Sequence, residues 1–477
     1  MSQPIIVWFR QDLRLDDNPA LAFACSSERP IIPLFIDSPE ERPLGISSLW
    51  WRGRSLAGLA DSLRQRGAEL VLAEGPAVDV LDRLIHETGA DTICWNRQYE
   101  PHGVERDTAI KSRLKERGLT VESFNACLLF EPWEIKNKSG GPFKVFTPFW
   151  RHCLARTHET PLAEPIDPPK SLNGCDRNVD SLPLDAFQHE LPSQAGRTAE
   201  LFHPGEGGAW AKLNAFTSRG LYDYADGRDF AAQESTSRLS PHLRWGEISP
   251  RRIWSHLHKA AADNKIQPAG LQKFLSELGW REFSNHLMFI NPDMHKHNLQ
   301  SQFDAFPWQS NPDMLEKWKY GETGYPMVDA GMRELLSTGF MHNRLRMITA
   351  SFLIKHLLID WREGEAWFWE RLVDADPGNN PAGWQWVAGC GADAAPFFRI
   401  FNPIIQGEKF DPDGRYIKQH VPELASVNGK PLYAPWTMKP SMIEETGLRL
   451  GADYPEPVVR HEDARERALA AFKSLSK

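Results

Sequence analysis

Short β-type segments alternate with longer helical segments over the first 125 residues, and this alternation limits the possible folds most strongly. Runs of β-branched and aromatic residues indicate strands at 5–8, 31–36, 69–73, 92–95 and 120–124. Helical patterns lie between them, near 47–66, 76–87 and 103–117. This order is typical of a parallel sheet that is covered by helices on both faces. We therefore predict an α/β domain with a doubly wound parallel sheet at residues 1–135.

The loop after the first predicted strand argues against two common kinds of nucleotide site. In a doubly wound sheet, ligands usually bind beyond the carboxyl ends of the strands. Residues 9–18 lie there and read Phe-Arg-Gln-Asp-Leu-Arg-Leu-Asp-Asp-Asn, without a glycine cluster. Dinucleotide and P-loop cradles need glycines so that the backbone can approach the phosphates. The domain is therefore not an ordinary NAD-binding or NTP-binding domain.

The middle of the chain separates this domain from a helical second half. Residues 155 to about 200 are rich in Pro, Asp, Ser and Asn and show little periodicity, which is typical of a linker. We place an interdomain linker at 136–204. Beyond it, helical periodicity predicts helices at 209–216, 250–261, 272–289, 313–320, 327–337, 341–358 and 365–373. We predict an all-helical domain at residues 205–477.

The composition limits the compartment and the partners. The chain of 477 residues is 41% hydrophobic and 25% charged, as in soluble globular proteins. It has no apolar run near the ~20 residues of a membrane span and no signal-peptide pattern at its N-terminus. Its six cysteines form no CxxC pair, which favours a reducing, cytoplasmic compartment. The net charge of −8 restricts any nucleic-acid contact to a local basic patch.

Residues 374–386 form the richest stretch for chemistry and read Asp-Ala-Asp-Pro-Gly-Asn-Asn-Pro-Ala-Gly-Trp-Gln-Trp. They end the region from Trp245 to Trp386, which holds ten of the 18 tryptophans. An unpaired buried polar group costs ~1–3 kcal/mol, so a loop of this kind needs partners when it is buried. The stretch is either the wall of a site for a flat ligand with donors and acceptors, or a capped turn in a helical core.

Two other segments carry groups that suit a ligand. Glu277, Trp280 and Arg281 share one face of a predicted helix, so a flat ligand could stack there. The alternative is a surface Glu–Arg pair beside a chance indole. The loop 235–240, Ser-Thr-Ser-Arg-Leu-Ser, offers hydroxyl and N–H groups that can hold a diphosphate, although loops are commonly rich in hydroxyls.

Two arginines lie where helix physics disfavours them. Arg344 and Arg346 follow the start of the predicted helix 341–358, where the helix dipole prefers acids. We expect that an acid or a phosphate holds them, and Asp374 and Asp376 are the candidate acids. The alternative is two solvated arginines.

Together these motifs resemble the cryptochrome/photolyase family, and most closely the bacterial DNA photolyases that repair cyclobutane pyrimidine dimers. The resemblance extends from about residue 4 to about residue 460. The matching segments, in order, are Trp8–Arg14, Thr236–Ser240, Trp280–Phe283, Thr323–Pro326, Met341–Arg344 and Asp374–Trp386. Members of this family hold FAD in their helical domain, which would here be the FAD- and DNA-binding catalytic domain.

The resemblance implies a set of FAD-binding residues. They are Tyr224, Thr236, Ser237, Leu239, Ser240, Arg281, Arg346, Asp374, Asp376 and Asn380. Arg346 and Asp374 would form an ion pair beside the flavin ring. Asn380 would face flavin N5, where an amide can hydrogen-bond a protonated nitrogen and favours repair over sensing.

The resemblance also implies a light-driven lyase, a photolyase, that transfers an electron from excited reduced FAD to a flipped-out dimer in UV-damaged DNA. The residues at the lesion would be Glu277, Trp280, Asn343, Met347 and Trp386. Electrons would reach the flavin through Trp308, Trp361 and Trp384, and DNA phosphates would contact Arg228, Arg344, Arg399 and Lys409. Met347 argues against the (6-4) lesion as substrate. The alternative function is a cryptochrome-type blue-light photoreceptor; a dark flavin oxidoreductase lacks any nicotinamide signature.

The resemblance implies a second chromophore, and the sequence leaves two candidates for its identity. Residues 99–103, Tyr-Glu-Pro-His-Gly, are closer to relatives that bind 8-hydroxy-5-deazaflavin. Lys296 instead matches relatives that bind methenyltetrahydrofolate. We expect an antenna chromophore in the N-terminal domain, a monomer, and no metal or membrane partner.

Overall fold

The computed structural model describes residues 2–176, 179–263, 268–393 and 398–475. Its internal contacts divide the chain into two compact units that are interleaved in sequence. Unit 1 comprises Met1–Glu190, Phe202–Tyr222 and Ser237–Pro292, and unit 2 comprises Leu191–Leu201, Asp223–Thr236 and Asp293–Lys477. These units are defined by contacts alone, so the functional domains that the sequence predicts at 1–135 and 205–477 stay predictions.

A five-stranded parallel sheet forms the centre of the N-terminal part of unit 1. The strands are β1 (Ile5–Phe9), β2 (Ile31–Asp37), β3 (Val71–Glu74), β4 (Thr92–Asn96) and β5 (Thr120–Phe124). Their order is β3-β2-β1-β4-β5, and Ile5 of β1 pairs with Ile31 of β2 and with Thr92 of β4. The order reverses at β1, as in doubly wound folds. The predicted parallel sheet is confirmed, and the predicted start of β3 is two residues too early.

Helices cover both faces of this sheet. They are α1 (Pro19–Cys25), α2 (Ile46–Arg64), α3 (Ala77–Thr88) and α4 (Pro101–Glu116). Because side chains alternate along a strand, Ile93 and Trp95 of β4 face a core that includes Leu84 of α3 and Leu114 of α4. Cys94 points the other way, and its thiol contacts the Ala20 carbonyl of α1 at 3.4 Å. The prediction of a doubly wound domain is therefore confirmed.

Unit 1 also contains helices from the middle of the chain. They are α5 (Phe146–Glu159), α7 (Glu206–Ala215), α9 (Ser240–Arg244), α10 (Pro250–Ala262) and α11 (Pro268–Ile290). Helix α5 lies within the stretch predicted as a linker, because its apolar residues Phe149, Trp150 and Cys153 are buried at helical spacing. The described part of the linker beyond Thr160 has short helical turns and one isolated parallel bridge, between Gly174 and Ile31.

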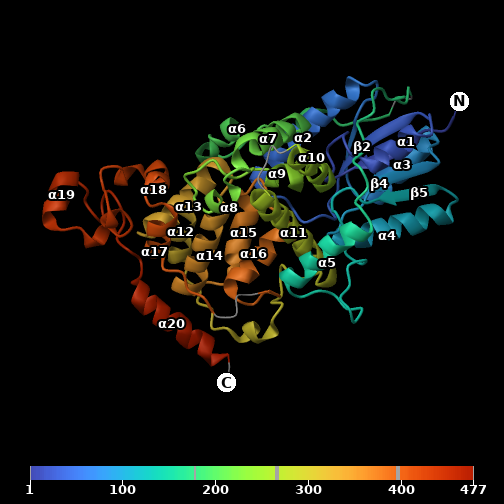
Figure 1. The fold of residues 1–477 in the computed structure, drawn as a ribbon. Coiled ribbons are helices and arrows are strands. Elements are labelled where there is room, and N and C mark those ends of the chain that lie inside the picture. The colour runs from blue at the N-terminus through green and yellow to red at the C-terminus, as the bar shows by residue number, and fades with distance from the viewer. Residues whose placement is uncertain (1, 177–178, 264–267, 394–397, 476–477) are drawn as a thin grey trace. The chain divides into compact units, whose positions relative to one another are not determined.

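In its described residues, unit 2 has helices and one isolated β-bridge, between Leu450 and Tyr454. Its α-helices are α6 (Thr198–Leu201), α8 (Tyr224–Gly227), α12 (Pro312–Tyr320), α13 (Pro326–Thr338), α14 (Asn343–Ser351), α15 (Trp361–Arg371), α16 (Asn379–Ala388), α17 (Pro403–Phe410), α18 (Arg415–His420), α19 (Pro440–Thr446) and α20 (His461–Ser474). Helix α14 continues into a π-helical turn at Phe352–His356. Figure 1 shows α12 to α16 side by side, and the packing of α13 on α14 and of α15 on α16 agrees with this view.

The treatment of residues 374–386 as one loop is wrong in its second half, which forms helix α16. Pro381 lies in the first turn of this helix, where its missing N–H has no intrahelical partner to lose. Gly389 ends the helix with a φ of 91°, a backbone conformation that glycine adopts without strain. Within the described residues, no helix is long and apolar enough to cross a membrane.

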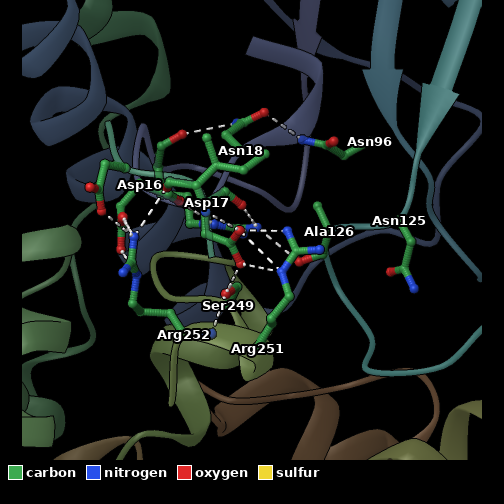
Figure 2. A network of polar contacts seen from close by, with 12 residues as sticks. Asp16, Asp17, Asn18, Asn96, Asn125, Ala126, Ser249, Arg251 and Arg252 are labelled. Atoms are coloured by element: carbon green, nitrogen blue, oxygen red, sulfur yellow. Dashed lines mark hydrogen bonds and ion pairs between the residues drawn. The ribbon is translucent and has the colours of Figure 1, made fainter. Parts of the chain in front are cut away.

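A buried polar network fixes the glycine-free loop after β1 (Figure 2). Asp17 is fully buried, has a φ of 47°, and accepts hydrogen bonds from the Ser249 hydroxyl and from Arg251 Nε at 3.0–3.1 Å. Asp16 pairs with Arg252, the next residue of α10. Two neighbouring acids of this loop are thus neutralised by two neighbouring arginines within unit 1. The loop has a structural role here, and this explains its charged composition.

Replacing Asp17 with alanine should lower the free energy of unfolding by about 3–5 kcal/mol, because it leaves a buried hydroxyl and an arginine without their acceptor. The exposed pair of Asp61 and Arg64 offers a control, since its side chains are 65% and 57% exposed. Asp61→Ala should change the stability by less than about 1 kcal/mol. Denaturant titration of the two variants measures both effects; equal effects would show that the network contributes no more than a surface pair.

Candidate functional site

The candidate site in unit 2 contains an ion pair between Arg346 and Asp374. Arg346 Nη2 donates to both carboxylate oxygens of Asp374 at 2.8 and 3.0 Å, and Nε donates to the Met341 carbonyl at 2.8 Å. Asp374 is buried, with 6% of its surface exposed. The acid therefore neutralises an arginine that the helix dipole would otherwise disfavour at the start of α14. The expected pairing of Arg346 with Asp374 is confirmed.

Asp376 fixes the start of α16. Its Oδ1 accepts hydrogen bonds from the backbone N–H groups of Gly378 at 2.9 Å and Asn379 at 2.6 Å. These N–H groups belong to the first turn, where they have no helical acceptor. Asp376 thus binds two N–H groups at the start of the helix from a position two residues before its N-cap, Gly378. Its predicted contact with flavin stays a prediction.

Asn380 presents a free acceptor after its own N–H groups are used. Its Nδ2 donates to the backbone carbonyl and to Oε1 of Glu365 in α15, both at 3.0 Å. These two bonds fix the orientation of the amide, because only the NH2 end can donate to two oxygens. Among the described residues, none donates to the Asn380 side-chain oxygen. The geometry suits a ligand that offers an N–H group.

Trp384 is buried in an aromatic cluster behind α16. Its ring lies 5.0 Å from Phe368 and 6.1 Å from Trp318, with edge-to-face angles of 72° and 71°. Gly364 makes room for the indole, because a Cβ at position 364 would lie 2.0 Å from Trp384 Cη2. Trp318, which is fully buried, was not among the predicted electron carriers. Nothing in the sequence distinguished it from the other tryptophans of this region.

The other two predicted electron carriers have different partners. Trp361 is buried, and its Nε1 donates to Asn298 Oδ1 at 2.9 Å. Trp308 packs on Phe306 with ring centroids 4.3 Å apart. The structure therefore brings Trp384 against Trp318 and gives Trp361 and Trp308 separate contacts.

Trp386 and Arg399 line one pocket of unit 2, together with Ser351, Lys355, Val387, Gly389 and Phe401. Lys355 is buried, and its amine donates to the Arg399 carbonyl. Burial lowers the pKa of Lys355 to about 7. A predicted lesion contact and a predicted phosphate contact thus lie side by side.

A basic cluster surrounds Phe410. Arg344 and Lys409 both lie over this ring, at 4.2 and 5.1 Å from its centre. Arg344 Nη2 also donates to Asp229 at 2.6 Å. Arg228 lies over the buried ring of Tyr224 at 5.3 Å. Three of the four predicted phosphate contacts therefore occupy one region of unit 2.

The remaining lesion residues of unit 2 lie on α14. Asn343 is exposed at the first position of the helix. Met347 is half-buried, and its sulfur lies 3.9 Å from Arg344 Nη1. Both side chains are available to a ligand at this end of the helix.

Helix α11 carries the predicted lesion residues of unit 1. Trp280 stacks on Phe146 with ring centroids 3.8 Å apart and planes at 9°. Glu277 pairs with Lys273 at 3.5 Å, and Arg281 Nη1 donates to the Cys127 carbonyl at 2.6 Å. One face of the Trp280 indole is therefore covered within unit 1, which leaves a single face for a ligand.

The hydroxyl loop before α9 has the backbone of an anion site. Arg238 adopts a left-handed conformation with a φ of 51°, and Leu239 follows with a right-handed φ of −85°. When a left-handed and a right-handed backbone conformation follow each other, the N–H groups of successive residues point into the same concave turn, and such a turn can bind an anion. Ser237 Oγ accepts from the Leu239 N–H at 3.3 Å, and Ser240 begins α9. Thr236 is half-buried and belongs to unit 2. The predicted contact of this loop with a diphosphate stays a prediction.

The sequence of this chain matches known proteins over almost its whole length. Residues 5–170 match the family described as DNA photolyase, and residues 274–474 match the family described as FAD binding domain of DNA photolyase. The deoxyribodipyrimidine photo-lyase of Agrobacterium fabrum is 50% identical over 476 residues, which cover 99% of this chain and 98% of that protein. Cryptochrome-2 of Arabidopsis thaliana is 38% identical over 99% of this chain and 79% of its own length.

A solved structure agrees with the sequence matches. The crystal structure of a bacterial class III photolyase from Agrobacterium tumefaciens superposes with a TM-score of 0.96 at 48% identity. The superposition covers 100% of this chain and 98% of that one. The α/β sheet and the helical FAD-binding domain are therefore those of photolyase structures.

Acid should destabilise unit 2 through histidines that the fold keeps neutral. Burial lowers the pKa of His342 and of His420 to about 4 and that of His356 to about 3, from an ordinary value of 6.5. The unfolded chain therefore binds more protons than the folded chain below pH 6.5, so stability falls as the pH is lowered from 6.5 toward 4. At pH 5.5 we expect a loss of about 1 kcal/mol for each histidine.

Thermal unfolding at a series of pH values measures this loss. His420→Leu should flatten the dependence below pH 6.5, whereas the same change at the exposed His158 should leave it as in the wild type. Equal pH profiles for the wild type and His420→Leu would contradict the prediction that protonation of His420 destabilises the folded chain.

Proposed function

Because this chain belongs to the cryptochrome/photolyase family, we propose that it is a photolyase that binds FAD and uses light to split cyclobutane pyrimidine dimers in DNA. The observation that carries the proposal is Asn380, whose amide is fixed by Glu365 so that its oxygen is offered to a ligand N–H. An amide at this position suits repair, whereas an acid is expected in plant sensors.

The donor groups of this chain match the parts of FAD. The backbone at Arg238 and Leu239, with the hydroxyls of Thr236, Ser237 and Ser240, would hold the diphosphate. Arg346 and Asp374 would lie beside the flavin ring as a neutral pair. Tyr224, Arg281 and Asp376 complete the proposed FAD contacts. Reduced FAD, when bound, supplies under light the electron that splits the dimer, so the chain contributes position and electrostatics.

The proposed lesion contacts are stacking and hydrogen bonding. Chemistry on a base requires that the base leaves the duplex stack. Trp280 and Trp386 would stack on the extruded dimer, and each base–aromatic stack contributes ~1–3 kcal/mol. Glu277 and Asn343 would hydrogen-bond the pyrimidine edges, and Met347 would pack against the lesion.

DNA phosphates would meet Arg228, Arg344, Arg399 and Lys409. Local basic contacts of this kind would allow a chain with a net charge of −8 to bind DNA. A second chromophore, methenyltetrahydrofolate or 8-hydroxy-5-deazaflavin, belongs to the proposal. So do a monomeric state and a cytoplasmic location.

The second candidate function is a blue-light photoreceptor without repair activity. The 38% identity to Cryptochrome-2 of Arabidopsis thaliana extends over 99% of this chain and supports it. The two functions differ in one property, which is turnover of a dimer by the fully reduced flavoprotein.

A repair assay separates the two functions. The purified flavoprotein, with its FAD fully reduced, is illuminated with an oligonucleotide that holds one thymine dimer. We expect loss of the dimer in light and none in darkness, and no repair of a matched oligonucleotide with a (6-4) lesion. Absence of turnover in light would leave the photoreceptor as the function.

Trp384 provides the test of electron supply. Trp384→Phe should abolish photoreduction of oxidised FAD, because the indole is the proposed donor nearest to the flavin, and should leave repair by pre-reduced enzyme intact. Trp367→Phe, on α15 and against Tyr320, is the control and should keep normal photoreduction. Transient absorption of the two variants measures the effect; normal photoreduction in Trp384→Phe would remove this residue from the electron path.

A further inference from the structure

The guanidinium of Arg344 is already engaged by an acid in unit 2. Its Nη2 donates to Asp229 Oδ2 at 2.6 Å, and its plane lies over the Phe410 ring at 4.2 Å. The side chain is 17% exposed, so it is positioned rather than solvated. Among the described residues, Arg344 Nη1 contacts one acceptor, the weak acceptor Met347 Sδ, at 3.9 Å. A guanidinium can bind an anion through two parallel hydrogen bonds. The Arg344 guanidinium makes one hydrogen bond to a carboxylate, so part of its donor capacity remains for a second anion contact.

Asp229 is the acid in this basic cluster. Its side chain is 36% exposed, and its second oxygen lies 4.0 Å from Arg228 Nε. Lys409 lies against the same Phe410 ring as Arg344. Phe230, the residue after Asp229, also contacts this ring, with centroids 6.3 Å apart. One partly exposed carboxylate therefore lies between two arginines, and a lysine contacts the same Phe410 ring as one of them.

The position of this carboxylate matches that of an anionic ligand. A carboxylate and a phosphate present the same planar pair of oxygens to a guanidinium. A DNA phosphate that binds Arg344 must therefore share it with Asp229 or displace Asp229. Solvent reaches the Asp229 carboxylate of this pair, and ion pairs that solvent screens contribute little free energy, so displacement is feasible at equilibrium.

We propose that Asp229 occupies Arg344 in the DNA-free protein as an intramolecular substitute for phosphate, and that a backbone phosphate of DNA displaces it. The inference rests on the proposed function, because it takes Arg344 as a phosphate contact. It adds a role for Asp229, which weakens binding to undamaged DNA. Selection of damaged DNA then depends more on stacking of the lesion than on charge.

Asp229→Asn tests the exchange, because it keeps the shape of the side chain and removes its charge. Asp226, exposed and three residues earlier, is a matched control, since Asp226→Asn changes the net charge by the same amount. Fluorescence anisotropy in the dark, with holoenzyme and an undamaged single-stranded oligonucleotide, measures binding. Asp229→Asn should bind about two- to five-fold tighter than Asp226→Asn, which is the range of a partly exposed ion pair. The difference should shrink as salt rises.

A double-mutant cycle identifies the partner. In an Arg344→Gln background, Asp229→Asn should bind no tighter than Asp226→Asn, because the arginine that it would release is gone. Asp229→Glu, which keeps the charge, should bind like the wild type. The ratio of flavin absorbance to protein checks that each variant is folded.

The outcomes are distinct. Equal affinities of Asp229→Asn and Asp226→Asn would overturn the exchange, and so would a gain that persists without Arg344. If the wild-type holoenzyme itself binds no DNA, the proposed function fails, and the inference fails with it.

Discussion

The ion pair between Arg346 and Asp374 is the interaction on which the candidate site of unit 2 depends. Arg346 lies on α14 and Asp374 in the segment that leads into α16, so the pair joins two helices that the sequence separates. Two residues later Asp376 accepts hydrogen bonds from N–H groups at the start of α16, and Asn380 of the first turn is fixed by Glu365. The Asp374 carboxylate, Asp376 Oδ1 and Asn380 Nδ2 thus all have partners inside unit 2. The Asn380 oxygen accepts no hydrogen bond from the described residues, so it can accept one from a ligand.

Hydrophobic periodicity predicted the strands and most of the helices. Helix α16 was missed because its segment contains prolines and glycines, which usually break helices. The sheet could be predicted because its strands are short apolar runs, and buried parallel strands require little else. Residues 374–386 were taken for a loop because Pro377, Gly378, Pro381 and Gly383 all interrupt helices in general. In the structure, Gly378 lies at the N-cap and Pro381 in the first turn, where these residues do no harm. Whether a proline or glycine interrupts a helix depends on its position in that helix, and the sequence pattern did not give the position at which α16 begins.

Residue types in the candidate site could be predicted, but many of their partners could not. The pairing of Arg346 with an acid followed from helix electrostatics, which act locally. The neighbours of Trp384 depend instead on how α12, α15 and α16 pack, so Trp318 and Gly364 carried no signal in the sequence. Asp229 was missed for the same reason: it is one acid in an irregular segment, 115 residues from Arg344. The interleaving of the two compact units is likewise a property of tertiary contacts, and no composition boundary marks it.

In the proposed function, charged side chains bind the DNA backbone and aromatic side chains recognise the lesion. Phosphate contacts act on every stretch of DNA alike, because the backbone is the same everywhere. An enzyme that searches for rare lesions therefore gains little selectivity from stronger phosphate binding. A net charge of −8 and an acid inside the basic cluster both weaken this common component. The exposed faces of aromatic residues such as Trp280 act only on a base that has left the stack. The acidity of the chain is thus consistent with DNA binding, since it leaves the choice of site to the contacts that only a lesion can make.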